Sequence, residues 1–447
     1  MAEPRNILLI FVDSLRADHL GCYGYDRPTS PNIDRLAGEG AVFERFFAPS
    51  VPTQPSFTTV YTGQYSLTHG VVSHKGGAQG DNDLKPGTPW FPALLRQAGF
   101  LTASFDCLPR YKSWFVHGFE FLVDSTFPGP DDGYSCERLN TRVLPWLRTH
   151  SDERFFAAIH YWDPHTPYLP PERYRHFHEG DPTDPARNTL APLADQYFGI
   201  MWRKWFEKLP PGMCDAEYVV GLYDGEIRHA DEGVGQVLDT LRECGHEEDT
   251  LVILLSDHGE LHYRHDIFFD HHGLYDGNIR CPLIARWPGV IRPGTRRGAF
   301  AQHVDLAPTL LSAVGVEPHE AMEGQSLLPV LADDATKLRD FVVSQECTWQ
   351  AKWALRDGTH KLILARKPDF HHMPPRELYD LRADPDELHN LAEEQPELVR
   401  ELEARLEGWI AEGMAKNGLA EDPVATHGIT LGQAWEDWIA RGKPREG

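Results

Sequence analysis

Four side chains have the types and positions needed to turn an alcohol into a nucleophile. Thr53 precedes a helix-like segment, so its hydroxyl would lie at a helix start, where free backbone N–H groups favour an anion. Asp13 and the pair Asp257–His258 each follow a run of apolar residues. Two carboxylates and an imidazole suit Zn²⁺ or Mn²⁺ as ligands. Such a cation would activate the Thr53 alcohol, which is otherwise a weak nucleophile.

Each of these residues alone also has an ordinary structural interpretation. The threonine of a Thr-x-Pro-Ser sequence is more often a helix N-cap than a nucleophile. Asp13 could be only a turn residue after a strand, and His258 a hydrogen-bonded structural histidine. The functional interpretation therefore depends on the four residues acting as a set.

Three apolar runs predict the strands that would bring this set together. They span residues 7–12, 154–160 and 250–256, and each is apolar on both faces, as in a buried parallel sheet. Acidic residues or histidines follow all three. Ligands of open α/β sheets bind at the carboxyl ends of strands, so a site is expected at this edge.

The rest of the chain predicts an α/β fold in two parts and a tail. Helical patterns at 32–40, 91–99 and 218–244 would flank a large mixed, mostly parallel sheet. Alternating runs after residue 340, followed by a helix at 396–415, indicate a small antiparallel sheet with a helix. The predicted parts are a catalytic domain at 1–335 with an inserted lid or wall at 179–215, a C-terminal α+β subdomain at 336–420, and a tail at 421–447.

Charge and cysteine content limit the classes of binding partner and the cellular location that we expect. The formal charge of −24, from 43 basic and 67 acidic residues, disfavours nucleic acid and anionic membranes as partners. A small ester substrate fits better, and a homo-oligomer is allowed but not indicated. The seven cysteines form no CxxC pair, which argues against a disulfide framework. With no apolar run of membrane length, we expect a cytoplasmic protein.

Several motifs in this order resemble the sulfatases and phosphonate monoester hydrolases of the alkaline phosphatase superfamily. The resemblance covers nearly the whole chain. It is carried by Asp13-Ser14-Leu15-Arg16-Ala17-Asp18, Ser30-Pro31-Asn32-Ile33, the segment from Thr53 to Gly63, Asp163-Pro164-His165 with Pro167-Tyr168, Ser256-Asp257-His258-Gly259-Glu260, His272-Gly273-Leu274, and Leu378-Tyr379-Asp380-Leu381.

The departures from that family pattern bear on the reaction. Sulfatases oxidise a cysteine or serine at the position of Thr53 to an aldehyde, which threonine cannot give because its Cβ carries a methyl group. The arginine that follows in those enzymes is Phe57 here, and their second metal-binding aspartate is Ser14. The lysines expected after residue 105 and after His272-Gly273-Leu274 are also missing.

The resemblance therefore implies metal-dependent hydrolysis of phosphate diesters, or of phosphate or phosphonate monoesters, through a phospho-Thr53 intermediate. The alternatives are a sulfatase without the aldehyde, or a phosphotransferase. His165 would protonate the leaving group, and His272 is a further catalytic candidate. The neighbours of the missing lysine, Arg110, Tyr111 and Lys112, are candidates for substrate binding.

We expect one divalent metal, Zn²⁺ or Mn²⁺. The types of the remaining candidate ligands favour the presence and the absence of a second metal about equally. The candidate ligands for a second ion are Asp163, His165, His265, His271 and His272. Another polar set has the residue types of a metal site, but its helical spacing favours a solvated face, and we expect it to be exposed. It comprises Asp224, Glu226, His229 and Asp231.

Overall fold

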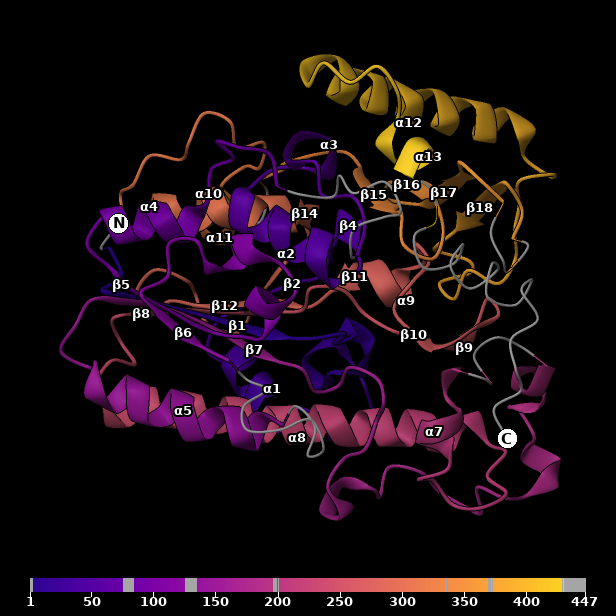
Figure 1. The fold of residues 1–447 in the computed structure, drawn as a ribbon, viewed down its shortest axis with the longest axis horizontal. Coiled ribbons are helices and arrows are strands. Elements are labelled where there is room, and N and C mark those ends of the chain that lie inside the picture. Colours follow the sequence, from indigo (N-terminus) through magenta and orange to yellow (C-terminus); the bar gives the residue numbers. More distant parts are fainter. Residues whose placement is uncertain are drawn as a thin grey trace.

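An eight-stranded sheet forms the centre of the computed structural model (Figure 1), which describes residues 3–74, 84–124, 135–195, 199, 201–333, 336–368, 371, 373–427 and 429. Of these eight strands, β12 runs antiparallel to both neighbours, and the other pairings are parallel. In spatial order the strands are β13 (Thr295–Arg297), β2 (Ala41–Phe43), β12 (Leu283–Arg286), β8 (Thr250–Leu255), β1 (Asn6–Val12), β7 (Phe155–Tyr161), β5 (Leu101–Phe105) and β6 (Phe121–Val123).

Helices cover both faces of this sheet because its central strands are apolar on both sides. Along β1, Ile7, Leu9 and Phe11 belong to one buried core, and the alternate residues belong to another. The first core packs under α2 (Thr53–Thr62), α4 (Phe91–Gln97) and α10 (Leu306–Ala313). The second packs against α1 (Pro31–Gly38), α5 (Cys136–Thr149) and α8 (Ala216–Glu243), which lie below the sheet in Figure 1.

A second sheet of five strands lies beside the first and carries a long helix, α12 (Pro396–Lys416). Four of its strands are antiparallel, and β4 adds in parallel at the edge. Since β4 ends two residues before Thr53, this sheet supports the segment that leads to the predicted nucleophile. Its order is β18 (Arg376–Asp380), β17 (His360–Ala365), β16 (Lys352–Arg356), β15 (Val342–Glu346) and β4 (Ser50–Val51).

Short elements connect these layers. The strands β9 (Leu261–Arg264) and β10 (Ile267–Asp270) form a hairpin, and β11 (Arg280–Cys281), β3 (Phe46–Phe47) and β14 (Ala301–Gln302) form a small sheet. The short helices are α3 (Ser66–His69), α7 (Arg203–Phe206), α9 (Asp276–Ile279), α11 (Leu328–Ala332), α13 (Pro423–His427), η1 (Ala17–His19), η2 (Gly21–Tyr23), η3 (Leu108–Arg110), η4 (Ser113–Val116), η6 (Glu172–Tyr174), η7 (Pro185–Arg187), η8 (Ala191–Asp195) and η9 (His303–Asp305).

The predicted fold class is confirmed: a large, mostly parallel sheet lies between helices, with a small antiparallel sheet beside it. The expectation of a solvated polar face on α8 is wrong. Asp224, Glu226, His229 and Asp231 are all buried, at 0, 6, 3 and 0% exposure. They are covered because α1 and α5 pack on α8. The close approach of α5 requires glycine at position 233, since a Cβ added there would lie 2.9 Å from Cβ of Cys136.

Within the described ranges, no helix is both long and apolar enough to cross a membrane.

Candidate active site

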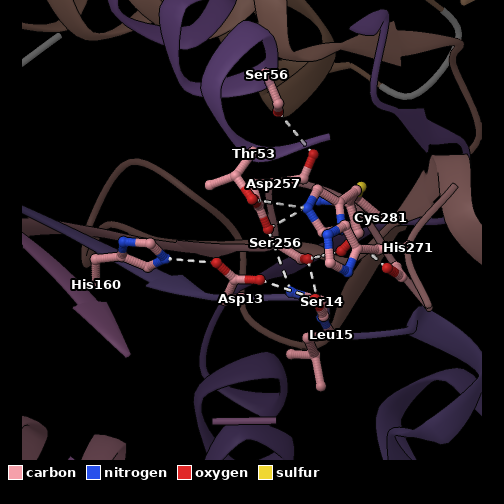
Figure 2. Close-up of polar contacts among 12 residues, drawn as sticks. Asp13, Ser14, Leu15, Thr53, Ser56, His160, Ser256, Asp257, His271 and Cys281 are labelled. Atoms are coloured by element: carbon pink, nitrogen blue, oxygen red, sulfur yellow. Dashed lines mark hydrogen bonds and ion pairs between the residues drawn. The ribbon is translucent and has the colours of Figure 1, made fainter. Parts of the chain in front are cut away.

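Asp13 and Ser14 mark the carboxyl end of β1, the strand between β7 and β8. Asp13 is fully buried, and the Ser14 hydroxyl donates a hydrogen bond to Oδ1 of Asp13 at 2.8 Å. Ser14 has a φ of 55°, which is uncommon for a residue other than glycine. Its backbone N–H donates to Oδ1 of Asp257 at 3.2 Å. The sharp turn after β1 thus brings two carboxylates from neighbouring strands together (Figure 2).

Thr53 is the first residue of α2, and its hydroxyl points at this pair of strand ends. Its Oγ1 lies 3.1 Å from Nε2 of His258, and the residue is 1% exposed. The first-turn N–H groups of a helix have no carbonyl partner within the helix, so they favour negative charge beside Thr53. The helix is fixed over β8 by Ser56, whose hydroxyl donates to the carbonyl of Asp257 at 2.7 Å (Figure 2).

The orientation of His258 is set by the backbone. Nδ1 lies 2.9 Å from the carbonyl oxygen of Gly259, which can only accept, so Nδ1 carries the proton. In the tautomer that carries its proton on Nδ1 alone, the lone pair of Nε2 faces Oδ2 of Asp257, 3.1 Å away. That buried carboxylate oxygen has no hydrogen-bond donor among the described residues. Two acceptors facing each other leave room for a cation between them.

The donor set fits a divalent metal. One ligand atom each from Asp13, Asp257 and His258 lie within 4.8 Å of one another, and all three residues are buried. Burial and the neighbouring charge of Asp13 raise the pKa of Asp257 to about 6. Two buried carboxylates this close cannot both ionise easily without a positive charge. These residues would hold the ion, with Thr53 beside it.

His160 is a residue of this site that the sequence analysis did not identify. Its Nε2 lies 3.1 Å from Oδ2 of Asp13 and its Nδ1 lies 2.9 Å from Oδ1 of Asp106. Burial opposes the charged ring, but the charge of Asp106 and the hydrogen bonds that the ring donates to both carboxylates outweigh it and raise the pKa of His160 to about 10. Conversely, burial would raise the pKa of Asp13, and the hydrogen bond from His160 lowers it below its usual value.

Phe57 occupies the place of the arginine expected from the family pattern. It is fully buried, with its ring centroid 4.6 Å from that of His160 and 4.4 Å from that of Phe11. No lysine or arginine of the described ranges is hydrogen-bonded or ion-paired to Asp13, Thr53, Asp257 or His258. Among the groups described here, the fixed positive charge at this site is on the ring of His160.

His271 and His165 extend the site from His258, and His272 has other neighbours. The ring of His271 stacks on His258 at 4.8 Å, and the ring of His165 lies 4.7 Å from His271. Burial, followed by the charge of His165, lowers the pKa of His271 well below its usual value. His272 is buried, with Nε2 at 2.8 Å from Nε2 of His371 and Nδ1 at 3.3 Å from Oδ1 of Asp270.

The other predicted ligands of a second ion do not meet at this point. His265 stacks on Tyr275, with ring centroids 3.6 Å apart, and lines a different cavity that also includes Arg16 and Glu387. Asp163 accepts the backbone N–H of Cys136 at 2.8 Å and groups with Cys136 and His229. A second site of the predicted composition is therefore not assembled among the described residues.

The three candidates for substrate binding follow β5: Arg110 ends η3, and Tyr111 and Lys112 come next. Arg110 is ion-paired with Asp124, and its side chain is 55% exposed. Nζ of Lys112 lies 5.1 Å from the ring centre of Trp114, and Tyr111 is 43% exposed. Their part in binding remains a prediction.

Comparisons with known proteins identify the family of this chain. The family model described as "Sulfatase" matches residues 5–316. The chain belongs to the sulfatase family. The family lies within the alkaline phosphatase superfamily, so the recognition made from the motifs is confirmed. A second model, "N-sulphoglucosamine sulphohydrolase, C-terminal", matches residues 264–412. Members of the sulfatase family bind a divalent metal, in keeping with the cluster at Asp13, Asp257 and His258.

Curated relatives of this sulfatase-family chain include two sulfatases. It is 24% identical to the N-acetylglucosamine-6-O-sulfatase of Bacteroides thetaiotaomicron, over 89% of this chain and 85% of the relative. It is 27% identical to human arylsulfatase A, over 95% of this chain and 92% of the relative. Among solved structures, the phosphonate monoester hydrolase of Silicibacter pomeroyi superposes with a TM-score of 0.72 at 24% identity, covering 92% of this chain and 95% of that one. That last likeness establishes the fold alone.

Proposed function

We propose that this member of the sulfatase family is a metal-dependent hydrolase of a small anionic ester, with Thr53 as its nucleophile. The observation that carries the proposal is the position of Oγ1 of Thr53, 3.1 Å from Nε2 of His258 and beside the buried carboxylates of Asp13 and Asp257. A divalent cation held by these residues would stabilise an ionised threonine oxygen and neutralise oxygens of the substrate.

The chain's own groups support a two-step reaction. Thr53 releases its hydroxyl proton to solvent, and Oγ1 bonds to the phosphorus or sulfur atom as the ester bond to the leaving alcohol breaks. His165 lies at the rim of the site; its Nδ1 is 2.6 Å from the carbonyl of Thr166, which leaves Nε2 to protonate the leaving oxygen. Water then cleaves the bond at Oγ1 and restores the Thr53 hydroxyl.

Two ester classes have separate support. The N-acetylglucosamine-6-O-sulfatase and arylsulfatase A relatives favour a sulfate ester. A phosphate or phosphonate ester is favoured by Thr53 itself, which cannot form the aldehyde of family sulfatases, and by the lack of a paired lysine or arginine at the described nucleophile site. Zn²⁺ and Mn²⁺ both suit the ligand set.

A substrate panel separates these possibilities. Metal-loaded protein would be assayed with nitrophenyl esters of phosphate, as mono- and diesters, of phosphonate and of sulfate, and kcat/KM compared. An added alcohol acceptor tests the phosphotransferase alternative, since transfer would yield a new ester in place of inorganic product. Hydrolysis of one anionic class that depends on Thr53 supports the proposal. Failure of the fully metal-loaded protein to cleave any of these esters would overturn it.

A cytoplasmic location is also proposed. It is supported by the seven cysteines, all of which are free thiols in the structure.

A further inference from the structure

A second cluster of metal-ligating side chains lies on the α5–α8 side of the sheet. Cys136 begins α5, Asp163 follows β7, and Glu226 and His229 are one turn apart on α8. The four residues are 1, 8, 6 and 3% exposed. The sequence separates them by up to 93 positions, so the fold alone brings them together.

Three donor atoms of this cluster converge. Sγ of Cys136, a carboxylate oxygen of Asp163 and a ring nitrogen of His229 all lie within 4.8 Å of one another. Oε2 of Glu226 is 3.9 Å from Nδ1 of His229. Glutamate and histidine at i and i+3 of one helix project in the same direction, a spacing that helical metal sites use.

The state of His229 points independently to a ligand. Neither of its ring nitrogens has a hydrogen-bond partner among the described residues, although the side chain is buried. The nearest carboxylate oxygens lie 3.6 Å away on Glu137 and 3.9 Å away on Glu226, beyond hydrogen-bond distance. A buried imidazole with neither nitrogen satisfied is costly, and a cation would satisfy one of them.

The two carboxyl groups strengthen this point. Asp163 and Glu226 are both buried in this cluster, at 8 and 6% exposure, and buried carboxylates are normally paired or bound to a metal. A cation here would serve both the carboxyl groups and His229.

We propose that Cys136, Asp163 and His229, with Glu226 beside them, form a site for Zn²⁺, separate from the cluster at Asp13, Asp257 and His258. One sulfur, one nitrogen and one oxygen donor suit a zinc ion, and Glu226 lies close enough to His229 to supply a fourth ligand. Glu137, whose side chain is 50% exposed, lies 3.6 Å from Nε2 of His229 and is ion-paired with Arg173. The site is structural, since it ties the start of α5 and the middle of α8 to the turn at Asp163 that leads into His165.

Cobalt substitution tests this site without using activity. The metal-free full-length protein would be titrated with Co²⁺ and its near-ultraviolet absorption recorded, because a thiolate bound to Co²⁺ gives a charge-transfer band that oxygen and nitrogen ligands do not. The band is expected in the wild type and in Asp257→Asn, which disrupts the other cluster. It is expected to vanish in Cys136→Ser together with one equivalent of bound metal.

A matched cysteine control identifies the thiolate. Cys281 is buried near Asp257, so Cys281→Ser removes a thiol close to the other cluster and is expected to keep the band. The proposal is overturned if neither the wild type nor Asp257→Asn shows the band. Both proteins keep the new cluster intact, so a missing band could not be blamed on a misfolded cluster variant. It is also overturned if the band is lost in Cys281→Ser and kept in Cys136→Ser.

Thermal stability provides a second measurement. Zn²⁺ is expected to raise the Tm of Asp257→Asn, because its remaining site binds only the folded chain. It is expected to leave the Tm of the double variant Cys136→Ser, Asp257→Asn unchanged. An equal rise in both proteins would contradict the site.

Discussion

Nε2 of His160 lies 3.1 Å from Oδ2 of Asp13, and its other ring nitrogen lies 2.9 Å from Asp106. Because both nitrogens face carboxylates, both must donate, and the ring is held as a cation that orients Asp13. This is the arrangement of a positioning residue behind a metal ligand. It also places fixed positive charge at the base of the site, where the expected second aspartate is replaced by Ser14.

Replacing His160 by glutamine should therefore weaken metal binding. We expect the Kd of the divalent ion to rise roughly 10- to 100-fold, because Asp13 loses the partner that fixes its orientation. Competition with a coloured chelator measures this change directly. His246→Gln, a change at a histidine paired with Asp249 away from the site, should bind metal like the wild type. An unchanged Kd in His160→Gln would show that the contact has no such role.

Asp257→Asn should remove the metal from the cluster. The substitution removes a negative charge and can place an amide N–H, which cannot bind a cation, where Oδ2 of Asp257 faces His258. The protein should therefore lose one equivalent of bound ion. Metal analysis by mass spectrometry gives the stoichiometry. Asp231→Asn is a matched control, since Asp231 is equally buried but accepts hydrogen bonds from Asn32 and Ile33 at the start of α1. Equal metal content in Asp257→Asn and the control would refute the ligand assignment.

Phe57→Arg should destabilise the fold, although arginine is the residue expected at this position in the family. Phe57 is enclosed by Phe11, Tyr61 and the charged ring of His160, so a guanidinium there would be buried without a partner. We expect a loss of about 3–5 kcal/mol in the free energy of unfolding, measured in denaturant. Phe57→Leu, which keeps an apolar side chain, should lose only about 1 kcal/mol. Wild-type stability of Phe57→Arg would mean that the pocket can supply a counter-charge.

Acid should destabilise the protein partly through His69, which is fully buried in the neutral form. Its Nδ1 accepts the N–H of Val71 at 3.0 Å, so the proton lies on Nε2, which faces the hydroxyl of Thr59 at 3.1 Å. Burial lowers the pKa of His69 to about 3. The unfolded chain therefore binds this proton first, and stability present above pH 6.5 is lost as the pH falls towards 3.

The substitution His69→Asn isolates this effect, because asparagine can still accept from Val71 but does not titrate. Between pH 7 and pH 5 the wild type should lose about 2 kcal/mol more than His69→Asn, from one shifted group. Denaturant unfolding at the two pH values gives the difference. Parallel losses in the two proteins would show that His69 is not responsible.

The sequence predicted the strands and their ends because the signals are local. The run at 250–256 corresponds to β8 (Thr250–Leu255), and 154–160 to β7 (Phe155–Tyr161). Parallel pairing then brings Asp13 and Asp257 together without further information. His160 gave no comparable signal, since a histidine that ends an apolar run fits a strand. Only the register that pairs it with Phe11 places it beside Asp13.

Features that depend on tertiary packing could not be predicted in this way. Asp163 and His165 lie two residues apart, yet the turn sends one towards Cys136 and the other towards His271. The polar residues of α8 have the spacing of an exposed face, and their burial follows from how α1, α5 and the segment after β7 cover that helix. Neither arrangement has a signature within a short window of sequence.

The most direct test of the central claim is kcat/KM of metal-loaded Thr53→Ala on the best ester found, beside Thr53→Ser. Loss of the alcohol should lower kcat/KM by at least about 1,000-fold while circular dichroism stays unchanged, because no other described group at that position can form the covalent intermediate. Thr53→Ser keeps an alcohol and should retain measurable turnover. Wild-type turnover by folded Thr53→Ala would contradict the account.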